Sequence, residues 1–168
     1  MKWSQWKILV KQGLKEAVFP NVVHHFHDHK WLCERAILAL KNDIVYTTNR
    51  EHLSQLPGQV QKYKSVDTVP ETNEAVYYPT EFLNSLEPPG VSSHNLELEI
   101  GAQIMLLRNL DPSTLCNRTR LAVKKLIPLA IEDKIMTDHA AEQDFFIPRI
   151  QIILYDLPFQ FKLLQFPV

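Results

Sequence analysis

The sequence predicts an α+β chain, in which a helical first part is followed by a partial α/β segment and then by short antiparallel strands. Two patterns predict this order. Apolar residues recur at helical spacing near the start of the 168-residue chain, whereas apolar and charged residues alternate after residue 95. A hydrophobic fraction of 45% is enough to form a buried core, so the composition excludes a disordered or fibrous chain.

The first predicted element is an amphipathic helix. Pro20 and Asn21 interrupt its pattern, and a shorter helical piece is expected over residues 22–31. Residues 1–34 are therefore predicted to form a helical N-terminal segment. The apolar stripe of the first helix consists of Trp3, Trp6, Val10, Leu14, Ala17 and Val18.

Residues 35–95 are predicted to contain part of an α/β domain and a connector. Residues 35–40 (RAILAL) are a compact apolar run typical of a buried strand. Asn42 can cap a following helix, and Pro57 with Gly58 ends it. A strand, a helix and a turn thus follow one another, and a turn-rich stretch over residues 87–95 (EPPGVSSHN) leads into the next part of the chain.

Residues 96–150 are predicted to form a small antiparallel barrel. A hairpin is expected over residues 96–107, because apolar residues alternate with glutamates up to Ile100 and Gly101 precedes a second apolar run. Asp111 and Pro112 supply a turn. Further strands are expected over residues 119–126, 131–136 and 144–150, and a last extended segment over residues 161–168.

The net charge of −1 conceals an asymmetry along the chain. Residues 65–107 contain seven carboxylates and no Lys or Arg, whereas residues 108–125 contain five cations against Asp111 alone. Such a basic stripe is what a nucleic-acid backbone attracts, and it is also typical of a solvated protein face. The charge pattern leaves both interpretations open.

Common catalytic and membrane signatures are missing from the sequence. None of the four glycines is followed by Lys, so no GxxxxGK(S/T) phosphate loop can be drawn, and no HExxH or GxGxxG motif occurs. The apolar runs are too short to cross a bilayer. Cys33 and Cys116 stand apart from any CxxC pair, which favours reduced thiols in an intracellular chain. We therefore expect no catalytic residue, no bound metal and no cofactor in this chain.

The four histidines of residues 24–29 form a histidine cluster, which is a candidate metal site. On a helix His25 and His29 share one face, and on a strand His25, His27 and His29 do, so either geometry offers ligands. Histidines on a polar helix need no metal, however, and the remaining ligands of a closed zinc site are not specified. We therefore prefer the interpretation in which these histidines bind no metal.

Six blocks of the sequence resemble the Helitron-type helicases of the Pif family in order and spacing. The longest block contains the run IGAQIMLLRNLD and is highly specific. The blocks are residues 31–43 (WLCERAILALKND), 56–58 (LPG), 78–90 (YPTEFLNSLEPPG), 96–120 (LELEIGAQIMLLRNLDPSTLCNRTR), 146–150 (FIPRI) and 156–168 (DLPFQFKLLQFPV).

This resemblance implies an ATP-driven DNA helicase with two RecA-like domains, the second interrupted by an SH3-like β-barrel, acting in DNA repair and recombination. It places residues 36–55 at the start of the second RecA-like domain, residues 96–150 on the barrel, and residues 151–168 on a return toward the RecA-like domain. The family's phosphate loop and magnesium motif would precede residue 1, and its arginine finger would follow Val168. We therefore expect a chain cut at both ends, with ATP and Mg²⁺ bound by motor domains encoded elsewhere.

The resemblance also implies contacts with single-stranded DNA. The candidates for these weak, non-specific contacts are Arg108, Asn117, Arg120, Lys124 and Lys125. The alternative for each is a solvated barrel surface. Asn49 matches a helix position of the family and is expected to be structural.

The sequence departs from the family at three positions. Leu40 and Gln103 stand where Pro is usual, and Arg118 stands where Gly is usual. If the turn at Arg118 needs a positive φ angle, a residue other than glycine costs about 1 kcal/mol or more. These departures favour an alternative function, namely an inactive transposon-derived relic or a partner-binding fragment. A helicase part would be expected in the nucleus.

Overall fold

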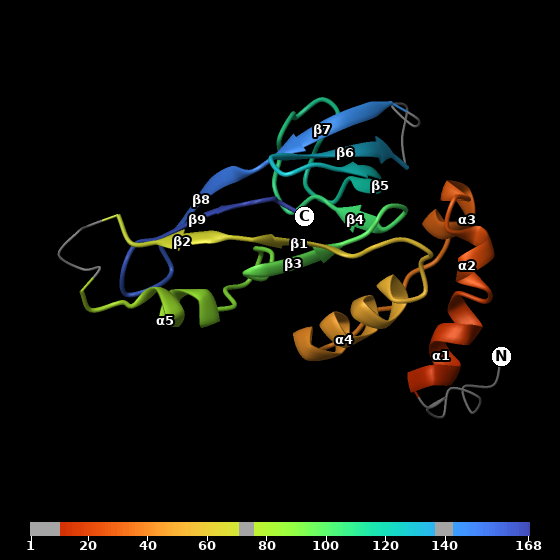
Figure 1. Cartoon of the computed structure of the whole chain (residues 1–168), viewed down its shortest axis with the longest axis horizontal. Coiled ribbons are helices and arrows are strands. Elements are labelled where there is room, and N and C mark those ends of the chain that lie inside the picture. Colours follow the sequence, from red (N-terminus) through yellow and green to blue (C-terminus); the bar gives the residue numbers. More distant parts are fainter. Residues whose placement is uncertain (1–10, 71–75, 137–142) are drawn as a thin grey trace. The chain divides into compact units, whose positions relative to one another are not determined.

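The computed structural model describes residues 11–70, 76–136 and 143–168. The chain divides into two compact units, Met1–Pro57 and Gly58–Val168 (Figure 1). The described part of the first unit is helical, and the second unit contains the strands. We find no helix among the described residues with the length and apolarity needed to cross a bilayer.

The first unit contains four helices in its described part: α1 Lys11–Val18, α2 Val22–His25, α3 His29–Cys33 and α4 Asn42–Leu53. Asn21 adopts a left-handed conformation with φ of 53°, which confirms the predicted break after the first helix. Asp28 caps α3 by accepting a hydrogen bond of 3.0 Å from the backbone N–H of Trp31. Trp3, Trp6 and Val10 of the predicted stripe lie outside the described residues.

Two details of the first unit differ from the sequence prediction. Asn42 is the first residue of α4, and Lys41 occupies the N-cap position instead. The expected strand over residues 35–40 is absent, and Leu38 and Leu40 are 94% and 104% exposed. An apolar run becomes a strand only when another strand accepts its backbone hydrogen bonds, and within the described residues none pairs with this run.

The described part of the second unit contains three antiparallel sheets and one helix, α5 Thr80–Ser85. Four strands of the predicted barrel region form one sheet of order β4-β5-β6-β7. The inner face of this sheet packs into the core. The sheets are β1 Gln61–Lys64 with β3 Asn95–Leu98; β2 Val66–Thr68 with β9 Phe161–Gln165 and β8 Ile150–Leu154; and β4 Gln103–Met105 with β5 Arg120–Leu126, β6 Ala130–Ile135 and β7 Asp144–Pro148.

The predicted hairpin over residues 96–107 is wrong. Strand β3 pairs with β1 through the register Gln61↔Leu98 to Lys64↔Asn95, and β4 pairs with β5. Gly101, with φ of 87°, redirects the chain between β3 and β4. Buried Glu99 accepts a hydrogen bond from the backbone N–H of Gly58, which fixes the start of the unit to the end of β3. The expected alternation holds only up to Leu98, because Glu99 is buried and Ile100 is 51% exposed. Alternation also carries no information about the partner strand.

The strands β5, β6 and β9 occur where the sequence predicted extended structure. The predicted strand over residues 144–150 is divided at Arg149, because β7 and β8 belong to different sheets. Within the described residues no closed barrel is found, so the firm description is a mixed helix and strand fold with antiparallel sheets. The SH3-like barrel and the four-part domain division stay predictions.

Candidate nucleic-acid interface

One face of the β4–β7 sheet gathers the charged side chains of the predicted site, and we call it the outer sheet face. Directly opposed residues of an antiparallel ladder point to the same side of the sheet. Lys125 lies opposite Glu132, and Glu132 lies opposite Phe146, so these three side chains share the outer sheet face. By the same alternation the face consists of Gln103, Met105, Arg120, Ala122, Lys125, Ala130, Glu132, Lys134, Asp144, Phe146 and Pro148, and Lys124 joins it through its contacts with Glu132 and Asp144.

Lys124 occupies a β-bulge in β5. The pairing register shifts between Val123 and Lys125, so Lys124 is the additional residue of the bulged strand. Its Nζ donates to Asp144 Oδ2 at 2.6 Å and lies 2.9 Å from Glu132 Oε1. These hydrogen bonds, chiefly the one to Asp144, raise the pKa of Lys124. Lys124 is therefore a permanent cation at neutral pH, but two carboxylates already hold it.

Arg120 and Lys125 complete the part of the predicted site that the structure brings together. Arg120 Nη2 donates to Gln103 Oε1 at 3.1 Å across the β4–β5 pair, and Lys125 is exposed. Three of the five predicted DNA-contacting residues therefore come from β5 and lie on the outer sheet face.

The other two candidates, Arg108 and Asn117, lie in the segment that connects β4 with β5. Arg108 Nη1 donates to the carbonyl of Leu107 at 3.4 Å, and the N–H of Asn117 donates to Asn109 Oδ1 at 2.6 Å. Neither residue belongs to a strand of the sheet. The structure therefore does not bring them onto the outer sheet face through the ladder that aligns the other three.

The turn that enters β5 has the conformation suspected from the sequence. The N–H of Thr119 donates to the carbonyl of Cys116 at 3.0 Å, so Asn117 and Arg118 are its central residues. Arg118 has φ of 73°, in the left-handed region that favours glycine. Its own N–H donates to the carbonyl of Leu106 at 2.7 Å and ties the turn to the end of β4.

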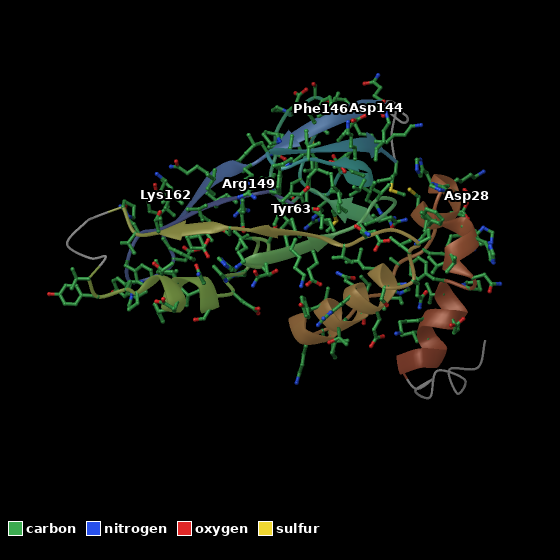
Figure 2. The ribbon with its side chains drawn as sticks, in the orientation of Figure 1. Asp28, Tyr63, Asp144, Phe146, Arg149 and Lys162 are labelled. Atoms are coloured by element: carbon green, nitrogen blue, oxygen red, sulfur yellow. The ribbon has the colours of Figure 1, made fainter. Side chains whose placement is uncertain are left out.

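Sequence reasoning missed Phe146, which lies on the outer sheet face with 61% of its surface exposed. Figure 2 shows Phe146 and Asp144 together along β7. A signal was available: Phe145, Phe146 and Ile147 are consecutive in the sequence, so strand alternation had to turn one large apolar side chain outward. Met105, 46% exposed, is a second apolar residue on this face.

Sequence reasoning also missed Asp133, which lies on the opposite, inner face of the same sheet. It is fully buried between Ile131 and Ile135 along β6, and neither carboxylate oxygen has a hydrogen-bond partner among the described residues. Burial, with a smaller contribution from the charge of Glu132, raises the pKa of Asp133 to about 8. The adjacent pair Glu132 and Asp133 was the signal, because alternation had to turn one of the two carboxylates inward.

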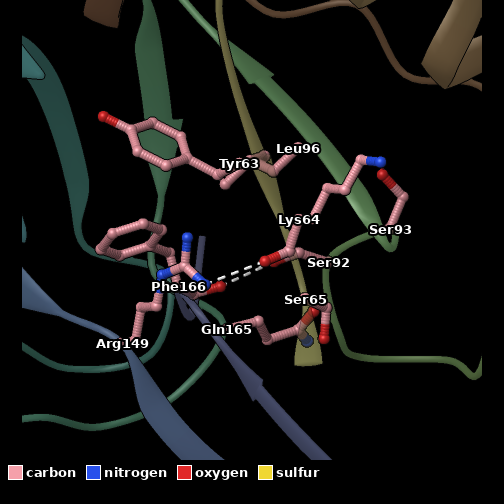
Figure 3. Close-up of a pocket in the computed structure, with 9 residues that line it drawn as sticks. All are labelled: Tyr63, Lys64, Ser65, Ser92, Ser93, Leu96, Arg149, Gln165 and Phe166. Carbon is pink, nitrogen blue, oxygen red and sulfur yellow. Dashed lines mark hydrogen bonds between the residues drawn. The ribbon is translucent and has the colours of Figure 1, made fainter. Parts of the chain in front are cut away.

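Arg149 forms a junction between the sheets rather than a ligand site (Figure 3). Its guanidinium lies 5.3 Å from the ring centroid of Phe166 and 5.9 Å from that of Tyr63, and Nη1 donates to the carbonyl of Lys64 at 2.9 Å. The adjacent cavity has a volume of about 10 Å³, room for about one water molecule. Burial raises the pKa of Tyr63, whose hydroxyl donates to the carbonyl of Ile127 at 3.0 Å.

The histidine cluster of the first unit is held by ring contacts. His25 stacks on Trp31 with centroids 4.6 Å apart, and the rings of His27 and Phe26 lie 3.8 Å apart. In the part of the chain that the structure describes, no three potential ligands come together around a metal position.

Comparisons with known proteins find similarity to the Pif1 DNA helicases. Residues 81–126, which include β3, β4, β5 and all of α5 except its first residue, match the family model of the DNA helicase Pif1 2B domain. The ATP-dependent DNA helicase PIF1 of Danio rerio is 35% identical over 74 residues, which cover 44% of this chain and 10% of that protein. The chain therefore spans a small part of the curated relatives it matches.

Two solved structures share the fold. A crystal structure of Pif1 helicase from Candida albicans superposes on 95% of this chain and 44% of its own, with a TM-score of 0.53 and 19% identity. A Bacteroides Pif1 structure bound to single-stranded DNA covers 90% of this chain and 37% of its own, with a TM-score of 0.50 and 18% identity.

Proposed function

Because this chain is related to the Pif-family DNA helicases, with which it shares a 2B-domain segment, we propose that its outer sheet face contributes weak contacts to single-stranded DNA. The observation that carries the proposal is the placement of Arg120, Lys124 and Lys125 on one face of one sheet. Phosphate contacts from such a face are insensitive to base sequence.

The charges of the outer sheet face explain why the contacts should be weak. Four cations, Arg120, Lys124, Lys125 and Lys134, share the face with the carboxylates of Glu132 and Asp144, so its net charge is 4 − 2 = +2. Lys124 must exchange both carboxylates for a phosphate before it contributes. Binding should therefore depend strongly on salt and little on sequence.

The residues of this chain do not fit ATP. A phosphate cradle needs a glycine-rich loop followed by Lys, and none of the glycines is followed by Lys. Gly58 instead gives its backbone N–H to Glu99, whose carboxylate would repel a phosphate. Binding of ATP and Mg²⁺, and unwinding itself, are thus assigned to motor domains that this sequence does not contain, and we expect no ATPase activity from this chain.

The proposal extends to the architecture of the intact enzyme. Residues 36–55 would begin the second RecA-like domain, with exposed Leu38 and Leu40 completing a strand in a sheet that other segments supply. Residues 96–150 would correspond to an SH3-like barrel. A Helitron-type origin, a nuclear location and a role in repair or recombination belong to the same proposal.

The second candidate function is a decayed, inactive fragment or one that only binds a protein partner. It is favoured by Arg118, because a residue other than glycine at φ of 73° strains a turn next to the proposed interface. Selection for DNA binding would be expected to remove such strain.

Binding of a fluorescent oligo(dT) to the whole chain, followed by anisotropy across a salt series, separates the two candidates. Two to four phosphate contacts predict a log–log salt slope of about −1.4 to −2.8 on single strands. A matched random-sequence strand should give the same slope. The absence of measurable binding in low salt would contradict the DNA-contact proposal and leave the second candidate.

A further inference from the structure

We propose that Phe146 is a stacking platform for one base of a single strand, with Lys124 and Lys125 holding the neighbouring phosphates. This inference rests on the proposed function and deepens it. It assigns to the outer sheet face a contact that charge alone does not provide, and it predicts that the face prefers unpaired bases over a bare backbone.

The starting observation is the exposure of Phe146 in β7, a strand in which Phe145 is half-buried and Pro148 is exposed. Phe146 is 61% exposed, whereas Ile147, the next residue, is fully buried in the core. Leaving a phenyl ring in water forfeits the free energy that its burial would release. A base that stacks on the ring would recover part of this free energy, and the cations of the same face can hold the phosphates beside it.

The position of the ring relative to the cations is fixed by the strand register. Phe146 lies directly opposite Glu132, and Glu132 Oε1 lies 2.9 Å from Lys124 Nζ. Asp144, two residues before Phe146 in β7, is bonded to the same Nζ at 2.6 Å. Lys125 lies opposite Glu132 on its other side. The ring on β7 and the two lysines on β5 therefore lie on the same face of the sheet, with Glu132 of β6 between them.

This arrangement suits single-stranded nucleic acid more than a duplex or a protein. Proteins that bind single strands without sequence preference combine a basic surface with aromatic rings on which bases stack. A duplex keeps its bases stacked on one another and offers no free base face to an isolated ring. The net positive charge of the face favours a polyanion.

The test compares Phe146→Ala with Phe146→Trp in the whole chain. The ligands are oligo(dT) and a strand of the same length whose residues lack bases. Phe146→Ala should weaken binding to oligo(dT) about fivefold or more and leave the base-free strand unaffected. Phe146→Trp should retain or strengthen binding to oligo(dT). Tyr155→Ala, which removes another exposed aromatic ring, 71% exposed, in the loop after β8, is the matched control and should change neither affinity.

The salt dependence distinguishes this inference from the proposed function. Stacking releases no counterions, so Phe146→Ala should lower affinity at an unchanged salt slope, whereas loss of a lysine should flatten the slope. Equal affinity of Phe146→Ala and the wild type for oligo(dT), with the wild-type slope intact, would overturn the stacking role and leave the basic face standing. Equal weakening on both strands would also overturn it. No wild-type binding would overturn both.

A second copy of the chain is the competing occupant of this surface. Analytical ultracentrifugation of the wild type and Phe146→Ala, without DNA, measures that possibility. A monomer in both cases supports the stacking role. A dimer that dissociates in Phe146→Ala would instead identify the exposed ring as a contact between chains and overturn it.

Discussion

On the inner face of the β4–β7 sheet the carboxyl group of Asp133 lies among isoleucines, whereas on the outer face the ring of Phe146 lies among charged side chains. Each residue has the wrong polarity for its face. The costs differ greatly, because an unpartnered carboxyl in the core loses its hydration while a phenyl ring on the surface only fails to gain burial.

Asp133 and Phe146 both break the alternation of polar and apolar residues, but they affect different properties of the protein. Natural sequences break the alternation of polar and apolar residues mainly at strained or functional positions. Asp133 lowers stability in a way that depends on pH, and Phe146 keeps an apolar surface available beside two lysines. Substitutions of Asp133 should therefore be tested by their effect on folding stability, and substitutions of Phe146 by their effect on DNA binding.

The largest expected effect belongs to Asp133→Asn. The pKa of Asp133 is raised from 3.8 to about 8, so between these values the folded chain holds a proton that the unfolded chain has released. Stability therefore falls as pH rises through this window, by up to about 1.4 kcal/mol per pH unit, and changes no further above it. Asp133→Asn should remove this component of the slope.

Urea unfolding of the wild type and Asp133→Asn at several pH values between 4 and 9 measures the difference. Asp156→Asn, which changes an exposed carboxylate in the same unit, should keep the wild-type slope. If Asp133→Asn and the wild type lose stability in parallel over this range, Asp133 is ionised in the folded chain and the comparison of the two faces fails.

A smaller effect is expected at the turn that leads into β5. Arg118→Gly should stabilise the second unit by about 1 kcal/mol, because glycine adopts φ of 73° without the steric cost that arginine carries. Thermal unfolding should show a higher midpoint. Gly101→Ala is the opposite control, since it places a Cβ at φ of 87° and should lower the midpoint. A lower midpoint for Arg118→Gly would mean that the arginine side chain contributes more than its backbone costs.

The smallest effect concerns the outer face alone. Asp144→Asn should strengthen binding of single-stranded DNA by about twofold to fourfold, because it frees Lys124 from its shorter carboxylate contact and adds up to one counterion to the salt slope, about −0.7. The thermal midpoint should hardly change, as expected for an exposed ion pair. Asp156→Asn again serves as the control. Weaker binding by Asp144→Asn would show that the carboxylate positions Lys124 for the phosphate instead of competing with it.

The sequence was sufficient to predict local structure, but it was insufficient to predict which strands pair with one another. The break at Asn21 and the strand β5 depend on residues close in the chain, and turn chemistry and pattern predicted them. The left-handed turn at Arg118 was raised by the family resemblance, which has Gly at that position. The pairing of β3 with β1 joins residues more than 30 positions apart, and alternation cannot specify it. The strand expected over residues 35–40 failed for a related reason, because its apolar run has no partner strand among the described residues.

The candidate site, like the fold, could be predicted only where it depends on local sequence. The charge pattern located the cations of β5. The β-bulge that places Lys124 next to Asp144 and Glu132, however, depends on the pairing of three strands. Phe146 and Asp133 were visible in principle, since two adjacent phenylalanines and two adjacent carboxylates cannot all face the side that suits them. What the sequence could not provide was which member of each pair faces inward.

A salt titration measures whether the cations of the outer sheet face meet phosphates. Oligo(dT) binding by the double variant Arg120→Ala, Lys124→Ala is compared with that of Lys62→Ala, Lys162→Ala, which removes two cations from β1 and β9. We expect the first double variant to flatten the log–log salt slope by about one unit or more and the second double variant to leave the slope unchanged. A wild-type slope in the first pair, or equal flattening in both, would contradict the assignment of DNA contact to the outer sheet face.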